Sequence, residues 1–240
     1  MALAATALSA SSCYIKLNEE ARKALRDRIG AGEVVYSESD SRVVNPGEFK
    51  GITNIGCADI DFFVREGEPE VVITGTHRTR DSVKVNVDPD TGDLVIEMRG
   101  PVAFDEHVTV YAPSIQVLES HGSSDIVVHN GLSGEFFSVF LSGSGDVVIE
   151  GCETVGMVSI DKSGSGDLKA TVNSGSVSIS CTGSGDVVLE GKTGELTLYK
   201  SGSGSFYSGN MDAETVNVKE VSGSGEVAYR EGGKVSSATN

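Results

Sequence analysis

The chain has 240 residues, a hydrophobic content of 38% and a net charge of −16. That length is sufficient to bury a sizeable core in one or two domains. The acidic balance excludes a nucleic-acid-binding protein, because phosphate recognition requires clustered Lys and Arg. The four cysteines contain no CxxC pair, so neither a zinc site nor a disulfide framework is expected from Cys13, Cys57, Cys152 and Cys181.

Residues 1–13, "MALAATALSASSC", are small and apolar and end in a cysteine. This segment resembles the end of a secretory signal followed by a bacterial lipobox, although it lacks a basic start and has Ala10 where Leu is usual. We expect Cys13 to carry a lipid anchor that holds an extracytoplasmic protein at the cell envelope or outer membrane. The alternative is a disordered tail with an incidental cysteine. No segment approaches 18 consecutive apolar residues, so we expect membrane contact only through that anchor.

Residues 14–33 predict a short helical tether. Asn18 can cap a helix, and Glu19 and Glu20 suit the positive end of its dipole. The helix then ends at Gly30 and Gly32.

Residues 34–112 predict an irregular β section. Short runs such as "ADIDFFV" and "EVVITGT" alternate with turn sequences such as "NPGE", "EGEP" and "DPDTGD".

Residues 113–230 are periodic, and a glycine-serine phrase that mostly ends in an acidic residue marks each period. The last residues of the phrase are separated by 21, 21, 19, 19 and 21 positions, and they are Asp125, Asp146, Asp167, Asp186, Ser205 and Glu226. A fixed period near 20 residues fits two short strands and two corners, which predicts a parallel β-solenoid. We expect this section to continue residues 34–112 as one domain, with residues 231–240 as a flexible tail.

Side-chain alternation supports this prediction. The first and third positions after each phrase, such as Val147 and Ile149, are almost always apolar, as an inward face requires. A second inward pair precedes each phrase, separated by a polar outward column formed by Ser138, Ser159, Ser178 and Thr197. In the last coil Val216 and Val218 are out of step by one residue, which predicts a β-bulge.

The outward column that follows each phrase is less polar than expected and defines a candidate partner surface at Val127, Val148, Val188 and Tyr207. The alternative is that these β-branched residues only stabilise a parallel ladder or are covered by a neighbouring segment. Open solenoid ends leave self-association as a homo-oligomer an alternative partner mode.

The repeated phrase itself predicts tight corners between strands. Glycine tolerates positive φ angles, and Ser and Asp side chains can bond to nearby backbone amides. The structural glycines of this interpretation are Gly143, Gly145, Gly164, Gly166, Gly183, Gly185, Gly202, Gly204, Gly223 and Gly225.

Two other roles for the phrase remain open. Ca²⁺ could bridge the stacked carboxylates of Asp125, Asp146, Asp167, Asp186 and Glu226, although each corner offers few of the six to eight oxygens that Ca²⁺ prefers. A carbohydrate-active β-helix enzyme would place Lys or Arg beside such carboxylates, and no such constellation or catalytic motif is present. We expect no catalytic residue and no cofactor.

The order of these segments resembles a known bacterial family. "FKGITNIGCADIDFFVREGEPEVVITG", "DLVIEMRG", "VTVYAPSIQVLESHGSSDIVV" and the GSG repeats are together similar to the head GIN domain family of autotransporter adhesins, over about residues 45–230. The resemblance implies a right-handed β-helix with GSG motifs at the tight turn between two sheets, a cell-surface or periplasmic location, and a role in adhesion. This chain departs from the repeated aspartate at Ser205 and Glu226.

We therefore expect an all-β solenoid that acts as a non-enzymatic surface binding module, with a host-surface protein or glycan as the partner. A calcium- or glycan-binding envelope scaffold, a carbohydrate-active enzyme and an envelope-maintenance protein are the alternatives.

Overall fold

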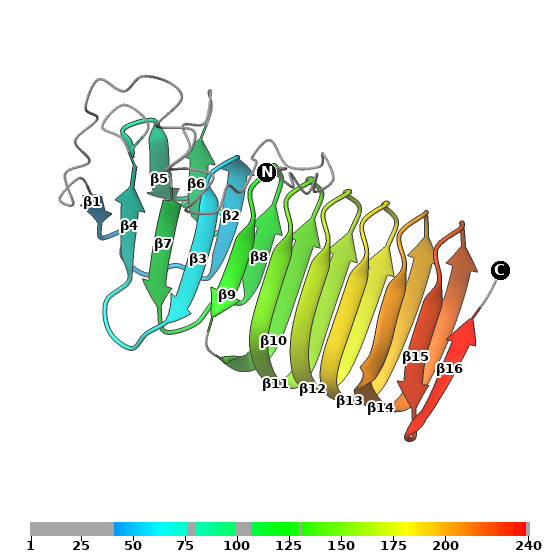
Figure 1. Ribbon diagram of the computed structural model, residues 1–240. Helices are drawn as coiled ribbons and strands as arrows, with labels where there is room; N and C mark the ends of the chain where they lie inside the picture. Colours follow the sequence, from blue (N-terminus) through cyan, green and yellow to red (C-terminus); the bar gives the residue numbers. More distant parts are fainter. Residues whose placement is uncertain (1–40, 76–79, 99–106, 130, 239–240) are drawn as a thin grey trace, which may run out of the picture.

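The computed structural model describes residues 41–75, 80–98, 107–129 and 131–238, which form one continuous sheet of 16 strands wound into a solenoid (Figure 1). The predicted all-β parallel solenoid is confirmed. The expected lipid anchor at Cys13 and the helical tether at 14–33 lie outside the described residues. Within the described residues, no helix has the length and apolar character needed to cross a membrane.

The regular coils are built from long strands that bend once, so that each strand contributes to both flat sides of the solenoid. Successive strands pair in parallel, and the turns between them are aligned along one edge (Figure 1). The long strands are β11 (Val147–Lys162), β12 (Leu168–Cys181), β13 (Val187–Ser201) and β14 (Phe206–Ser222), and the coils before them are formed by the shorter β8 (Val117–Ser120), β9 (Ile126–His129) and β10 (Leu132–Leu141).

The N-terminal section extends the same solenoid but does not follow chain order. The coil of β2 and β3 lies between the coil of β8 and β9 and the coil of β6 and β7, because β2 pairs with both β6 and β8, and β3 with both β7 and β9. Antiparallel strands β5, β4 and β1 then close this end. The strands are β1 (Ser41–Val44), β2 (Gly51–Gly56), β3 (Asp59–Val64), β4 (Glu70–Thr74), β5 (Val83–Val87), β6 (Leu94–Met98) and β7 (His107–Ala112).

A single hydrophobic core fills the solenoid between its two flat sides. The predicted inward columns are confirmed along β9 to β14: Val147 and Ile149 are buried, as are Phe137 and Val139 on the other side. The strict alternation of buried and outward residues arises because successive side chains of a strand point to opposite faces.

The predicted bulge in the last coil is also present. Strand β14 has one extra residue opposite the step from Val188 to Glu190 of β13, and this brings Val216 and Val218 opposite Leu196 and Leu198. A second shift follows at Tyr199. Val216 and Val218 are only half-buried, because they belong to the outermost coil of their side.

Among the described residues, the C-terminal end is capped on one side only. Strand β15 (Val227–Glu231) pairs in parallel with the first half of β14, and β16 (Lys234–Ala238) folds back on β15 as a hairpin. The turn, Gly232-Gly233, has φ angles of 52° and 81°, which suit a two-residue hairpin loop. Residues 234–238 are therefore a strand, and the expectation of a flexible tail from residue 231 was wrong for this part.

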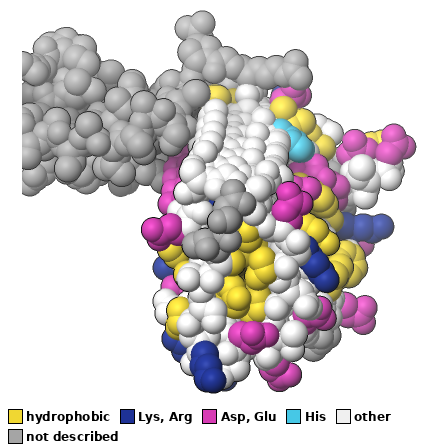
Figure 2. Space-filling view, turned by 90° about the vertical axis from the view of Figure 1, so that its right-hand side faces the viewer, with side chains coloured by type: hydrophobic (Ala, Val, Ile, Leu, Met, Phe, Trp, Pro, Cys, Tyr) yellow, Lys and Arg dark blue, Asp and Glu magenta, His cyan; other side chains and the backbone are white. Residues whose placement is uncertain are grey.

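Figure 2 looks at this end and shows hydrophobic side chains at the surface among charged ones. Glu231 protects part of the uncapped edge, because its carboxylate accepts the backbone N–H of Val216 at 2.9 Å. The charged Lys219 and Glu220 and the bulge beside them are further features that hinder edge-to-edge pairing.

Candidate functional site

The glycine-serine corners form a tightly stacked column, seen as rows of backbone and small side chains in Figure 2. A Cβ atom built on Gly164 would lie 1.8 Å from the carbonyl oxygen of Gly143 in the preceding coil. That carbonyl accepts the backbone N–H of Ser165 at 3.0 Å. The other corner glycines are in similarly close contact with the coil before them, so no side chain fits between successive corners.

This contact corrects the sequence-based reason for the glycines. Of the ten predicted corner glycines, only Gly202 and Gly223 have φ angles in the left-handed region, at 140° and 92°. At the other eight positions glycine is required because the coils stack closely, not because the backbone needs a positive φ.

The stacked carboxylates are held by hydrogen bonds between coils. The Oδ1 atom of Asp146 accepts the backbone N–H of Asp167 at 2.8 Å, and Oδ1 of Asp167 accepts that of Asp186 at 2.7 Å. The same bond from a side-chain oxygen to the backbone N–H of the next coil recurs at Asp59, Asp125 and Asp186. At the last step Ser205 Oγ accepts the backbone N–H of Glu226. We call this column the aspartate ladder; each member caps the strand that begins in the next coil.

A buried lysine lies directly beneath the ladder. Lys162 faces inward at 1% exposure, and its Nζ donates hydrogen bonds to the carbonyl oxygens of Gly185 at 2.8 Å and Gly164 at 3.4 Å. Burial lowers the pKa of Lys162, and the nearby ladder carboxylates oppose that shift. Lys200 repeats the arrangement two coils later with a bond to Gly202 O at 3.1 Å. The corner carbonyls therefore bind ammonium groups from inside the solenoid.

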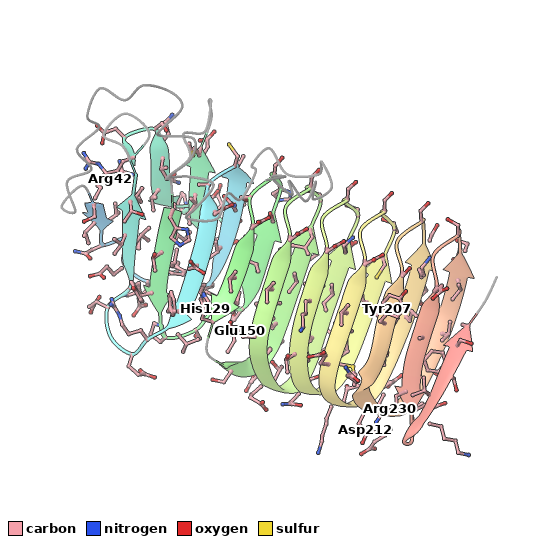
Figure 3. The ribbon with its side chains drawn as sticks, in the orientation of Figure 1. Arg42, His129, Glu150, Tyr207, Asp212 and Arg230 are labelled. Carbon is pink, nitrogen blue, oxygen red and sulfur yellow. The ribbon has the colours of Figure 1, made fainter. Side chains whose placement is uncertain are left out.

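A histidine and carboxylate cluster joins the N-terminal section to the regular coils. His129 on β9 places Nε2 2.6 Å from Asp61 Oδ1 and Nδ1 3.1 Å from Glu150 Oε2 (Figure 3). His107 on β7 contacts the other oxygen of Asp61. Burial acts to lower the pKa of His129, but the hydrogen bonds and charges of Asp61 and Glu150 outweigh it and raise the pKa above its ordinary value.

The rings beside this cluster cover one another. Phe63 stacks on His129 with a centroid distance of 4.3 Å and on Tyr111 with 5.6 Å. The guanidinium of Arg65 lies 4.1 Å from the centre of the Tyr111 ring. Both faces of the Phe63 ring are therefore occupied within the protein, which leaves ring edges as the accessible part of this stack.

The partner surface predicted from sequence lies on the same flat side as the aspartate ladder, which we call the ladder side. Val127, Val148 and Val188 share one row in register and are half-buried, and Tyr207 continues the row with 36% of its surface exposed. Lys169 interrupts the row. The structure thus places the predicted residues together, and their role as a partner surface stays a prediction.

Larger exposed side chains lie on the opposite flat side, formed by β5, β6, β2, β8, β10 and the second halves of β11–β14, which we call the serine side. Phe136, Phe140, Met157 and Tyr199 are 40–48% exposed there. Phe136 pairs directly with Met157, and Phe140 shares a row with Tyr199. Their outward positions follow from the strand alternation, but the sequence interpretation did not single them out.

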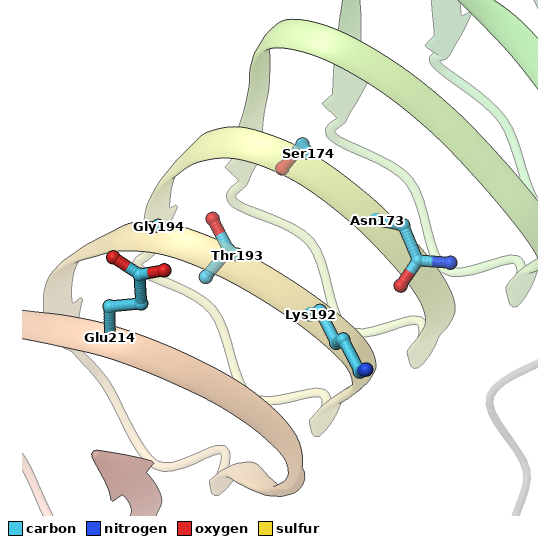
Figure 4. A pocket seen from close by; sticks show the side chains of 6 residues that line it. All are labelled: Asn173, Ser174, Lys192, Thr193, Gly194 and Glu214. Carbon is cyan, nitrogen blue, oxygen red and sulfur yellow. The ribbon is translucent and has the colours of Figure 1, made fainter. Parts of the chain in front are cut away.

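An open polar groove of about 410 Å³ lies at the bend between the two sides (Figure 4). The side chains of Asn173 and Lys192 project from neighbouring strands, and Glu214 lies near Thr193. The Thr193 hydroxyl donates to its own strand at Glu195 O, 3.0 Å away, and Ser174 bonds likewise to Ser176 O at 3.1 Å. These hydroxyl groups therefore serve to bend the strands.

No group of three or more His, Cys, Asp or Glu side chains among the described residues is arranged to hold a metal ion. Cys152 and Cys181 are buried free thiols. Burial raises the pKa of Cys181 to about 12, although the ammonium groups of Lys162 and Lys200 oppose this.

Sequence interpretation missed three features of this arrangement. Asp59 starts the ladder from a shorter corner, "GCAD", that lies 66 residues before Asp125 in the chain. Lys162 and Lys200 could have been found as basic residues at inward positions of the alternation. The third feature is His129, which bridges two coils, whereas His121 is exposed and bonded to Ser142 Oγ at 2.8 Å.

Comparison with known proteins identifies a family that this chain matches. The family model described as "Putative auto-transporter adhesin, head GIN domain" matches residues 48–239. No curated protein matches the chain.

Solved structures with the same fold come from Bacteroides fragilis and Parabacteroides distasonis. A "putative adhesin" of Bacteroides fragilis is 18% identical with a TM-score of 0.60, and the match covers 78% of this chain and 94% of that one. A "putative lipid binding protein" of Parabacteroides distasonis is 17% identical with a TM-score of 0.59, covering 74% and 76%. A second P. distasonis structure, a "putative adhesin", is 16% identical with a TM-score of 0.55, covering 73% and 75%.

At these identities the solved structures establish the solenoid fold alone, and the names refer to those proteins. The family model spans the N-terminal coils, every glycine-serine corner and the terminal hairpin. The chain therefore belongs to the head GIN domain family.

Proposed function

We propose that the chain is a non-enzymatic binding and adhesion module, held outside the cytoplasm by an acylated Cys13, that presents a flat side of its solenoid to a partner. The observation that carries the proposal is the group of exposed side chains on the serine side: Phe136, Phe140, Met157 and Tyr199 are 40–48% exposed. Large apolar side chains gathered on one outward face are typical of a binding surface.

The architecture supports a role in display. Successive coils are joined by continuous parallel pairing, by the aspartate ladder and by the stacked glycine corners, which makes the solenoid a rigid support for a linear surface. The ladder carboxylates have a structural role, since each accepts a hydrogen bond from a backbone amide of the next coil. The family description, which names an adhesin, is consistent with this proposal.

Surface display is tested by protease treatment of intact cells followed by quantification of the chain. We expect the protease to remove it, together with the ability of the cells to adhere to host matrix or glycan-coated surfaces. A chain that is fully protected from the protease would overturn the proposal.

The anchor is tested by fractionation. The variant Cys13→Ser should leave the membrane fraction, whereas the control Cys57→Ser should stay with it. Equal fractionation of both variants would contradict lipidation at Cys13.

The calcium alternative is tested separately by thermal melting with added Ca²⁺ and with a chelator. Because the ladder oxygens already accept backbone amides, we expect an unchanged melting temperature. A rise with Ca²⁺ that the chelator reverses would favour a calcium-stabilised scaffold.

A further inference from the structure

We propose that the serine side binds a neutral polysaccharide chain that lies across the strands, parallel to the solenoid axis. This inference deepens the proposed function, on which it rests, by naming the partner class and the face that binds it.

The composition of the face is repetitive. Between β10 and β13, twelve outward positions form three rows in register, and six of the twelve are Ser or Thr. The first row is Phe136, Met157, Ser176 and Glu195; the second is Ser138, Ser159, Ser178 and Thr197; the third is Phe140, Asp161, Ser180 and Tyr199. Small hydroxyl side chains thus lie between exposed rings on a flat sheet.

The rings of this face are 40–45% exposed and lie beside small or polar side chains, unlike the stacked ring of Phe63 on the ladder side. Tyr199 lies beside the small Ser180 in its row, and Phe140 lies beside Asp161. Phe63, in contrast, has a ring stacked on each face. Phe140 and Tyr199 are three strand spacings apart, or about 14 Å. They can therefore pack against the C–H faces of two separate sugar units of one chain.

The central row supplies polar groups for the same ligand. Within the described part of the chain, no hydrogen bond occupies the hydroxyls of Ser138, Ser159, Ser178 and Thr197. A hydroxyl group both donates and accepts hydrogen bonds, as sugar hydroxyls do. A row of them suits a polyhydroxylated ligand better than a lipid surface, because the hydroxyl row interrupts the apolar area.

Charge decides between neutral and anionic ligands. None of the twelve positions is Lys or Arg, and two are the carboxylates Asp161 and Glu195. The whole chain carries a net charge of −16. An anionic polysaccharide, a nucleic acid or an anionic membrane would be repelled by this face, whereas a neutral glycan would not.

The spacing of the strands on this face also suits a polysaccharide. Neighbouring strands are separated by about 4.8 Å, which is comparable to the advance of one sugar unit along an extended chain. A polysaccharide that crosses the strands therefore meets one hydroxyl of the central row at each unit, and its affinity accumulates over the coils.

The test uses the full 240-residue chain with Cys13→Ser, which keeps it free of acyl groups, in co-sedimentation with cellulose, chitin and insoluble β-1,3-glucan. We expect binding to at least one of them and none to alginate. The double variant Phe140→Ala/Tyr199→Ala should bind about tenfold more weakly or worse, because it removes both rings of the third row. Tyr199→Phe, which keeps the ring, should retain most of the binding, and Ser178→Lys should weaken it.

Tyr207→Ala is the matched control, since it removes an exposed tyrosine from the ladder side without touching the serine side. Thermal melting confirms that each variant is folded. The inference is overturned if no neutral polysaccharide binds, if Tyr207→Ala weakens binding as much as the double variant, or if alginate binds equally well. It is also overturned if the double variant abolishes cell adhesion while the chain binds no polysaccharide, since the partner is then a protein.

These outcomes separate the two proposals. Polysaccharide binding by a chain that is protected from protease on intact cells would support the ligand class and contradict surface display. Adhesion of cells without polysaccharide binding would leave the surface module in place and remove the ligand class.

Discussion

Replacing Gly164 by alanine tests the stacking of the corners. The new Cβ would lie 1.8 Å from the Gly143 carbonyl oxygen, and this distance must open to at least 3.0 Å. The two corners must therefore separate, and the 3.0 Å hydrogen bond from Ser165 N–H to that oxygen is lost. Gly164 does not have a positive φ angle, so the effect isolates close packing from backbone conformation.

The cost has two parts. A backbone group left without its partner costs about 1–3 kcal/mol, and the strain of overpacking costs about 1–3 kcal/mol. We therefore expect Gly164→Ala to lower the free energy of unfolding by about 2–6 kcal/mol.

Urea unfolding followed by far-ultraviolet circular dichroism measures this difference, and a constant slope with urea shows that the unfolded state has not changed. Gly209→Ala is the control, because a Cβ at Gly209 meets nothing within 4 Å. It should change the free energy of unfolding by no more than about 0.5 kcal/mol. If Gly164→Ala is no more destabilising than Gly209→Ala, the stacking explanation is refuted.

Three further predictions concern the ladder, the histidine cluster and the buried thiol. Asp146→Ala should lower the free energy of unfolding by about 1 kcal/mol, because the Asp167 N–H loses its acceptor. Asp146→Asn keeps an acceptor oxygen and should be less destabilising, so equal urea midpoints for the two variants would contradict the role of this bond. Because the pKa of His129 is raised in the folded state, its protonated form stabilises the fold fully below the unfolded pKa of 6.5 and this contribution is lost as the pH rises through the folded pKa. The free-energy difference between the native chain and His129→Gln should therefore be larger at about pH 5.5 than at about pH 8.5, and a difference independent of pH would count against it. Cys181, with a pKa of about 12, should resist iodoacetamide until urea unfolds the chain; labelling of the folded protein, mapped by mass spectrometry, would show that the site opens.

Much of the fold follows from the sequence because the solenoid repeats its pattern. The regular spacing from Asp125 to Glu226 sets the coil length, and alternation identifies Val147 and Ile149 as core residues. The misplaced Val216 and Val218 predict the bulge in β14 correctly, since only one extra residue returns them to the inward column. Each of these predictions rests on a periodic constraint that many coils share.

The remaining features depend on contacts that no local pattern records. The insertion of the β2–β3 coil between its neighbours pairs Ile60 with Ile126, 66 residues apart, and short strands of similar composition could pair in several orders. Strand β1 was not predicted at all, because "SRVV" is too short to show alternation. The role of Lys162 depends on carbonyl groups of the following coil, and the reason for Gly164 depends on the coil before it.

The serine side is the surface through which we propose that the chain binds its partner. The most direct measurement is the adherence of cells to a surface coated with neutral polysaccharide, with each variant displayed at an equal level. Cells with Phe140→Ala/Tyr199→Ala should adhere no better than cells without the chain, and cells with Tyr207→Ala should adhere like the native strain. Undiminished adherence of the double variant, or its loss with Tyr207→Ala, would contradict the claim.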